Sequence, residues 1–220
     1  MKKNIDTTAN KGIIFDVDGV LLDSMEIWTD LGARYLKSLG IEAEEGLGSI
    51  LFSMSMEQGA EYLNDHYQLH RSADQVMDGL RAMLRDYYFY EVCAKPGAEE
   101  VLSKLKAAGM RITAATSSPR EHIERALERN GLLGYIERLF TSAETGTSKH
   151  SPEIYNRAAE YMGTAADETY VIEDSLYALR TAANADYHTI GIFDANGESD
   201  QKGLEELSDI YISELNELSI

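Results

Sequence analysis

The sequence predicts an α/β fold: a Rossmann-like, doubly wound parallel sheet that is interrupted by one helical insert. Three observations lead to this expectation. Short apolar segments recur along the chain, helical patterns separate them, and residues 24–92 contain helical patterns only. Apolar runs that do not alternate with polar residues suit strands buried on both faces of a parallel sheet. Strands that alternate with helices build such a sheet with helices on its faces.

The expected strands are rich in β-branched residues and lie between segments with helix start and stop signals. They are residues 12–15, 111–115, 170–172 and 188–193, with 139–140 and 210–212 as weaker candidates. Ser118 before Pro119, with Glu121 three residues after the serine, predicts a helix with Ser118 as its N-cap. Ser151 and Pro152 predict the start of a further helix.

The helical insert is expected to contain three helices. They cover about residues 23–40, 56–67 and 72–87. Asp23 with Glu26, and Ser72 with Gln75, have the three-residue spacing of a capping box, which marks a helix start. The three helical patterns therefore begin and end inside one continuous stretch of chain.

The length of the chain fits a core with a smaller inserted domain. The chain has 220 residues, 44% of them apolar, and domains usually hold about 100–200 residues. We expect residues 1–23 and 93–220 to form the core and residues 24–92 to form the insert.

Composition excludes several classes of partner. With 20 Lys and Arg against 38 Asp and Glu, the net charge is −18, which disfavours nucleic acid and anionic membranes as partners. The single cysteine, Cys93, excludes an internal disulfide and a multi-cysteine zinc site.

Residues 1–12 are polar, unlike a signal peptide, and no apolar run approaches the ~20 residues that span a bilayer. We expect a cytoplasmic protein, monomeric or weakly dimeric.

Side chains able to carry chemistry follow the predicted strands, where open α/β sheets bind their ligands. They are Asp16 and Asp18, Thr116 and Ser117, Lys149, and Glu173 and Asp174. Crowded carboxylates repel one another unless a cation neutralises them, and oxygen ligands beside a phosphate favour Mg²⁺. Asp16 is then a candidate nucleophile. Asp18, two residues on, lies on the same side of an extended segment and could transfer protons.

The remaining three residues suit a phosphate group. Thr116 and Ser117 precede a predicted helix, so their hydroxyls and nearby backbone N–H groups can bind phosphate oxygens. Lys149 adds a positive charge for the transferring group, which the net charge of −18 makes more necessary for an anionic substrate.

In this order, the segments resemble the four motifs of the haloacid dehalogenase-like superfamily. The resemblance rests on DVDGV at residues 16–20 with Asp23 and Ser24, on Thr116-Ser117-Ser118, on Lys149, and on Glu173-Asp174-Ser175. It is greatest to the branch that contains phosphoglycolate phosphatase and β-phosphoglucomutase, in which a helical cap domain follows the first motif. The insert is accordingly expected to be a cap domain.

The resemblance implies a role for each motif residue. Asp16 would be the nucleophile, Asp18 the general acid and base, and Thr116 and Lys149 would bind the phosphoryl group. Mg²⁺ would be held by the Asp16 carboxylate, the Asp18 backbone carbonyl and Asp174. Glu173 would either ligate the ion or accept a hydrogen bond beside it.

The implied activity is a Mg²⁺-dependent phosphatase that hydrolyses a small phosphorylated metabolite through an aspartyl-phosphate. The alternatives are a phosphomutase of the β-phosphoglucomutase type and, less favoured, a non-catalytic phospho-acceptor switch. Trp28 stands where mutase-like members commonly have a histidine, and residues 51–56 lack the arginine of mutase caps. Asp18 disfavours carbon–halogen cleavage, because dehalogenases of the superfamily generally lack this acid, and a switch would not need it.

Apolar side chains in the insert allow two interpretations. Trp28, Met54, Met56 and the aromatic residues 88–90 could line an apolar substrate pocket, or they could pack between the insert and the core.

Overall fold

The computed structural model describes residues 3–52 and 54–220, and the chain divides into two compact units. The core unit comprises Met1–Ser24 and Val92–Ile220, and the helical unit comprises Met25–Glu91. Among the described residues of the helical unit there is no strand, as its helical patterns predict.

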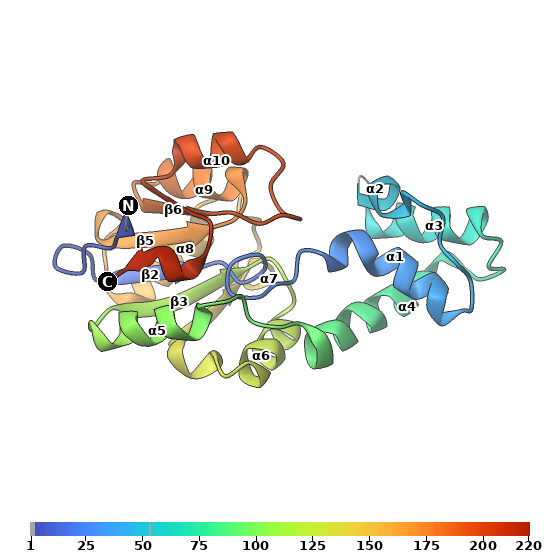
Figure 1. The fold of residues 1–220 in the computed structure, drawn as a ribbon, viewed down its shortest axis with the longest axis horizontal. Helices are drawn as coiled ribbons and strands as arrows, with labels where there is room; N and C mark the ends of the chain where they lie inside the picture. The colour runs from blue at the N-terminus through green and yellow to red at the C-terminus, as the bar shows by residue number, and fades with distance from the viewer. Residues whose placement is uncertain (1–2, 53) are drawn as a thin grey trace. The chain divides into compact units, whose positions relative to one another are not determined.

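A six-stranded, fully parallel sheet forms the centre of the core unit, with the strand order β4-β3-β2-β5-β6-β7 (Figure 1). Its strands are β2 (Gly12–Phe15), β3 (Arg111–Thr116), β4 (Arg138–Thr141), β5 (Thr169–Glu173), β6 (His188–Ile192) and β7 (Ile210–Ile212). Every residue of β2 and β5 is buried, as strands covered on both faces require. The predicted doubly wound α/β fold is confirmed.

Helices alternate with these strands along the chain. They are α5 (Ala98–Ala107), α6 (Arg120–Arg129), α7 (Ser142–Thr145), α8 (Glu153–Met162), α9 (Leu176–Ala183) and α10 (Gln201–Leu207), with short 3₁₀ turns η2 (Leu133–Tyr135), η3 (Ala166–Glu168) and η4 (Leu215–Glu217). Helix α8 packs its buried side chains against the sheet face that carries Ile14 and Val171. Two short strands not expected from the sequence, β1 (Lys3–Asn4) and β8 (Leu218–Ser219), pair with each other. Within residues 3–52 and 54–220, no helix is long and apolar enough to cross a membrane.

The order of the strands creates a switch point at β2. This strand pairs with β3 on one side and with β5 on the other, and the chain then extends the sheet outward on each side. Phe15 is in register with Ala114 of β3 and with Ile172 of β5. Residues that directly follow β2 therefore lie between the ends of both neighbouring strands, where ligands bind in folds of this kind.

The segment that leaves the core unit for the insert and the segment that returns from it lie side by side within the core unit. Leu22 and Ala94 form an antiparallel bridge. The N–H of Asp23 donates to the Cys93 carbonyl over 2.9 Å, and the N–H of Lys95 donates to the Leu21 carbonyl over 2.9 Å. These contacts tie the departing and returning segments into a two-stranded ribbon.

The helical unit consists of α1 (Ile27–Ser38), α2 (Leu47–Phe52), α3 (Met56–His66) and α4 (Ala73–Asp86), followed by one π-helical turn, η1 (Tyr87–Glu91). The capping box of Ser72 and Gln75 is confirmed. The one predicted for Asp23 and Glu26 is wrong, because α1 begins at Ile27 with no side-chain cap, and Asp23 belongs to the ribbon instead. The six-residue α2 is too short to produce a recognisable period and was not expected from the sequence.

Candidate active site

The side chains expected to carry chemistry lie at one edge of the sheet. Asp16 directly follows β2, and its N–H donates to the Ile172 carbonyl over 2.9 Å. Glu173 is the last residue of β5 and Asp174 the next residue, while Thr116 ends β3. Parallel strands end at the same edge, so a run of separate sequence segments converges on one site.

Three carboxylates form the centre of this site. Asp16, Glu173 and Asp174 are buried, and each offers an oxygen within 4.8 Å of the oxygens offered by the other two. Among the described residues, Glu173 Oε2 and Asp174 Oδ2 have no hydrogen-bond partner. Unpartnered buried carboxylate oxygens are costly, and a set of oxygen donors suits a hard divalent cation. These residues therefore fit a Mg²⁺ ion.

Lys149 bridges two of the three carboxylates. Its Nζ lies 2.6 Å from Asp16 Oδ1 and 2.8 Å from Glu173 Oε1, and its side chain is 3% exposed. Burial alone would lower the pKa of Lys149, but the two carboxylates more than offset it and raise that pKa. The lysine therefore stays charged and supplies a positive charge to the two carboxylates that it contacts.

The carboxylates themselves bind protons more tightly than free side chains do. Burial, followed by repulsion from Glu173, raises the pKa of Asp16 well above its usual range. Burial, followed by repulsion from Asp16, raises the pKa of Asp174 to about 8. Both shifts belong to the metal-free protein, and a further positive charge at the site would oppose them.

Asp18 lies outside the three-carboxylate cluster and has its own donors. Ser24 Oγ donates to Asp18 Oδ1 over 2.7 Å, and Ser118 Oγ donates to Asp18 Oδ2 over 2.7 Å. Two hydroxyls thus hold the carboxylate that we expect to transfer protons. The role predicted for Ser118 as a helix N-cap is wrong, because α6 begins at Arg120 after Pro119 with no side-chain cap.

Thr116 and Ser117 differ in their surroundings. Thr116 is fully buried, and its Oγ1 lies 3.5 Å from Asp18 Oδ2 and accepts from the Ser118 N–H over 3.0 Å. Ser117 is exposed, and its Oγ lies 3.2 Å from Ser142 Oγ. Thr116 therefore lies next to Asp18, whereas the Ser117 hydroxyl contacts Ser142, the first residue of α7.

Tyr155 belongs to the site but was not assigned to it from the sequence. Its hydroxyl donates to Glu173 Oε1 over 2.7 Å from a fully buried position in α8. Tyr155 lies in the helix that Ser151 and Pro152 predict, and a buried tyrosine hydroxyl needs a polar partner. That signal points to a hydrogen bond but does not identify the acceptor.

A loop after β6 closes one side of Asp174. Lys95 Nζ forms an ion pair with the buried Asp194 Oδ2 at 2.5 Å. At Gly197, a Cβ atom would lie 2.9 Å from Asp174 Oδ2 and 3.1 Å from Asp194 Cβ. The backbone at Gly197 therefore approaches Asp174 more closely than any larger residue would allow.

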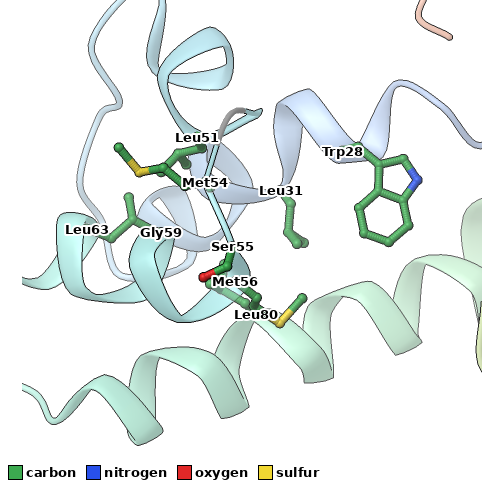
Figure 2. Close-up of a pocket in the computed structure, with 10 residues that line it drawn as sticks. Trp28, Leu31, Leu51, Met54, Ser55, Met56, Gly59, Leu63 and Leu80 are labelled. Atoms are coloured by element: carbon green, nitrogen blue, oxygen red, sulfur yellow. The ribbon is translucent and has the colours of Figure 1, made fainter. Parts of the chain in front are cut away.

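The helical unit contains an apolar pocket of about 250 Å³. Figure 2 shows Trp28 and Leu31 of α1, Met54, Met56 at the start of α3, and Leu80 of α4 around it. Its other lining residues are Gly32, Leu51, Ser55, Gly59 and Leu63. Three of the residues singled out from the sequence, Trp28, Met54 and Met56, thus line one pocket, whereas the aromatic residues 88–90 are not among its lining residues.

Comparison with known proteins agrees with these features. The family model described as haloacid dehalogenase-like hydrolase matches residues 13–192. A phosphorylated carbohydrates phosphatase of Thermotoga maritima is 26% identical over 176 residues, which cover 80% of this chain and 81% of that protein. Hexitol phosphatase A of Escherichia coli is 24% identical over 219 residues, which cover 96% and 94% of the two chains.

Solved structures share the fold. A candidate β-phosphoglucomutase of Thermotoga maritima superposes with a TM-score of 0.84 at 22% identity, covering 94% of this chain and 95% of that one. A HAD family hydrolase of Deinococcus radiodurans, solved with bound phosphate and sodium, has a TM-score of 0.74 at 22% identity, covering 95% and 93%. At these identities the likeness concerns the fold.

Proposed function

The chain belongs to the haloacid dehalogenase-like hydrolase family, and we propose that it is a Mg²⁺-dependent phosphatase of a small phosphorylated metabolite. One observation carries the proposal: Lys149 bridges Asp16 and Glu173 in a cluster of three buried carboxylates, two of whose oxygens, Glu173 Oε2 and Asp174 Oδ2, have no hydrogen-bond partner among the described residues. This arrangement provides a carboxylate nucleophile next to a fixed positive charge and a set of oxygens for a cation.

In the first half-reaction, an Asp16 oxygen attacks phosphorus and the bond from phosphorus to the leaving oxygen breaks. The products are an aspartyl-phosphate and an alcohol, and Asp18 donates the proton that the leaving oxygen needs. The hydroxyls of Ser24 and Ser118 hold both oxygens of Asp18 and thereby fix the proton donor. Thr116 and Lys149 bind the phosphoryl oxygens, and Ser117 joins them when its hydroxyl exchanges its contact with Ser142 Oγ for the phosphate.

In the second half-reaction, a water molecule attacks phosphorus and Asp18 accepts its proton. The bond between phosphorus and the Asp16 oxygen breaks, which releases inorganic phosphate and restores both aspartates. Lys149 stays paired with Asp16 throughout and stabilises the carboxylate as the leaving group.

Asp16, Asp174 and the backbone carbonyl of Asp18 would hold the cation, with Glu173 as a further ligand or as an acceptor beside them. When bound, a divalent cation offsets the repulsion among these carboxylates and between them and the phosphoryl oxygens. The protein's own contribution is to keep the oxygens buried and close together.

We propose further that the helical unit acts as the cap and that the ligand group it receives is apolar. The relatives named above act on phosphorylated carbohydrates and hexitols. Among the described residues, the pocket of the helical unit is instead lined mainly by apolar side chains, and the one hydroxyl there, on Ser55, accepts from the Gln58 N–H. A polyol in this pocket would leave most of its hydroxyls without partners, which is costly.

Phosphate release from a panel of phosphorylated metabolites, with Mg²⁺ and with EDTA, tests the proposed activity. We expect Mg²⁺-dependent release, and its loss in Asp16→Asn with the fold intact by circular dichroism. Asp65→Asn, an exposed position of α3, serves as the control and should retain activity. Retained activity in Asp16→Asn would rule out this nucleophile.

The same assays separate the alternatives. Interconversion of sugar phosphates without phosphate release would establish a phosphomutase. An aspartyl-phosphate that persists for hours would establish a phospho-acceptor switch. Rapid release of phosphate supports the hydrolase.

A further inference from the structure

The two oxygens of the Glu173 carboxylate are in different environments. Oε1 accepts from Lys149 Nζ over 2.8 Å and from the Tyr155 hydroxyl over 2.7 Å. Oε2 is buried and has no partner among the described residues. Two donors occupy both lone pairs of Oε1, so Oε2 is the oxygen left to bind a ligand.

Lys149 by itself does not fix this orientation. Its ammonium is shared between Glu173 and Asp16. It also carries three equivalent, rotating donors on a flexible stem. The terminal torsion of a glutamate is broad and two-fold, so a single shared donor leaves the carboxylate free to rotate.

Tyr155 provides the second, rigid donor. Its side chain is fully buried in the cluster that also contains Ile14, Val171 and Tyr187. Its ring packs edge-on against Tyr187, with centroids 6.1 Å apart. The phenol oxygen is therefore held in place by the packing of α8 on the sheet, and it fixes the plane of the Glu173 carboxylate.

We propose that Tyr155 is a positioning residue, which turns Glu173 so that its Oε2 faces a divalent cation bound at the carboxylate cluster. The inference rests on the proposed function, because it requires that Asp16, Glu173 and Asp174 bind Mg²⁺. It assigns to Tyr155 an effect on cation affinity that a purely structural tyrosine would not have.

Calorimetric titration of the full-length protein with Mg²⁺, without substrate, tests the inference. Tyr155→Phe removes the donor and keeps the ring, and we expect Mg²⁺ to bind about tenfold more weakly, as when other supporting partners of metal ligands are removed. The Mg²⁺ concentration that gives half-maximal phosphatase activity should rise by a similar factor. The KM for the phosphate ester, measured at saturating Mg²⁺, should stay unchanged.

Tyr187→Phe is the matched control. It removes a hydroxyl from the other member of the same aromatic pair, but this hydroxyl donates to Asn156 Oδ1 over 3.0 Å and does not contact Glu173. Its Mg²⁺ affinity should equal that of the unmodified protein. Thermal unfolding of both variants reports whether each is folded.

A second comparison separates positioning from general loosening of α8. In a Glu173→Gln background, Tyr155→Phe should change Mg²⁺ affinity little, because the effect passes through Glu173. An undiminished effect in that background, an equal effect of Tyr187→Phe, or unchanged affinity in Tyr155→Phe would each overturn the inference. If the unmodified protein bound no Mg²⁺, the proposed function itself would fail.

Discussion

Lys149 Nζ and Asp16 Oδ1 lie 2.6 Å apart, and both side chains are nearly inaccessible to solvent. The same nitrogen contacts Glu173, so one ammonium is the counter-charge of two buried carboxylates. Removal of one partner of a buried ion pair leaves the other uncompensated, which is more costly than the net contribution of the pair.

Lys149→Met should therefore reduce both stability and activity. In EDTA at pH 8 we expect the free energy of unfolding, measured with urea, to fall by about 3 kcal/mol. Phosphate release should fall by at least about a hundredfold, since one donor to a developing charge contributes about that much. Lys11→Met deletes the same charge from an exposed pair with Glu168 at 2.5 Å and should change neither. Equal effects of the two substitutions would contradict the role of Lys149.

The stability of the metal-free protein should decrease as the pH rises. In the folded state the pKa of Asp174 is about 8, against an ordinary value of 3.8, because of burial and then the charge of Asp16. The folded state therefore binds this proton more tightly than the unfolded state, so the stabilisation is complete below about pH 4 and is lost as the pH rises to about 8.

Thermal unfolding in EDTA and in Mg²⁺ between pH 5.5 and 8.5 measures this effect. We expect the midpoint in EDTA to fall with pH and the stabilisation by Mg²⁺ to grow, because the cation replaces the proton. Asp174→Asn should flatten the decline. A Mg²⁺ effect that does not depend on pH would argue against a cation at this carboxylate.

Gly197→Ala should weaken cation binding without preventing folding. The added Cβ would lie 2.9 Å from Asp174 Oδ2, so the carboxylate or the loop must move. We expect Mg²⁺ affinity by calorimetry to fall about tenfold, in the range found when groups supporting a metal ligand are disturbed. Gly134→Ala is the matched control, because its Cβ would meet no atom within 4 Å and should leave affinity unchanged. Unchanged affinity in Gly197→Ala would show that the loop yields instead.

The apolar pocket of the helical unit can be tested through fluorescence. Trp28 is the one tryptophan of the chain and lines this pocket, so its emission reports on occupancy. We expect 1-hexanol to change the emission saturably and sorbitol to leave it unchanged. Met56→Gln should weaken the response, whereas Met83→Gln, a half-buried position outside the pocket lining, should not. A response to sorbitol alone would indicate a polar ligand.

The parallel sheet and its edge of reactive side chains could be predicted from the sequence, because both depend on local patterns. Buried strands such as Gly12–Phe15 lack alternation, and the acids that follow Phe15 and Ile172 must meet once the two strands pair in parallel. The spacing of the residues does not assign their roles. The roles came from the order of the motifs, which resembles that of the haloacid dehalogenase-like superfamily.

Hydrogen bonds between residues that are distant in the sequence could not be predicted. Ser118 has the sequence context of a helix cap, yet its hydroxyl donates to Asp18, one hundred residues earlier in the chain. The local pattern predicts that the Ser118 hydroxyl accepts from nearby backbone N–H groups, whereas in the folded chain it donates to a carboxylate, and hydrogen bonds to a charged acceptor are the stronger ones. The hydrogen bond from Tyr155 to Glu173 likewise follows from how α8 packs on the sheet.

The ribbon formed by residues 21–23 and 93–95 has a consequence for how such a chain can diversify. Because the departing and returning segments are hydrogen-bonded neighbours, residues 25–91 can be replaced while the strands of the sheet keep their order and the ribbon stays paired. A short turn that joins the two sides of the ribbon should leave a core that folds. A different insert could be joined at the same two positions. Because Ser24 donates to Asp18 Oδ1, such an exchange keeps the carboxylate of Asp18 in place only when Ser24 is retained.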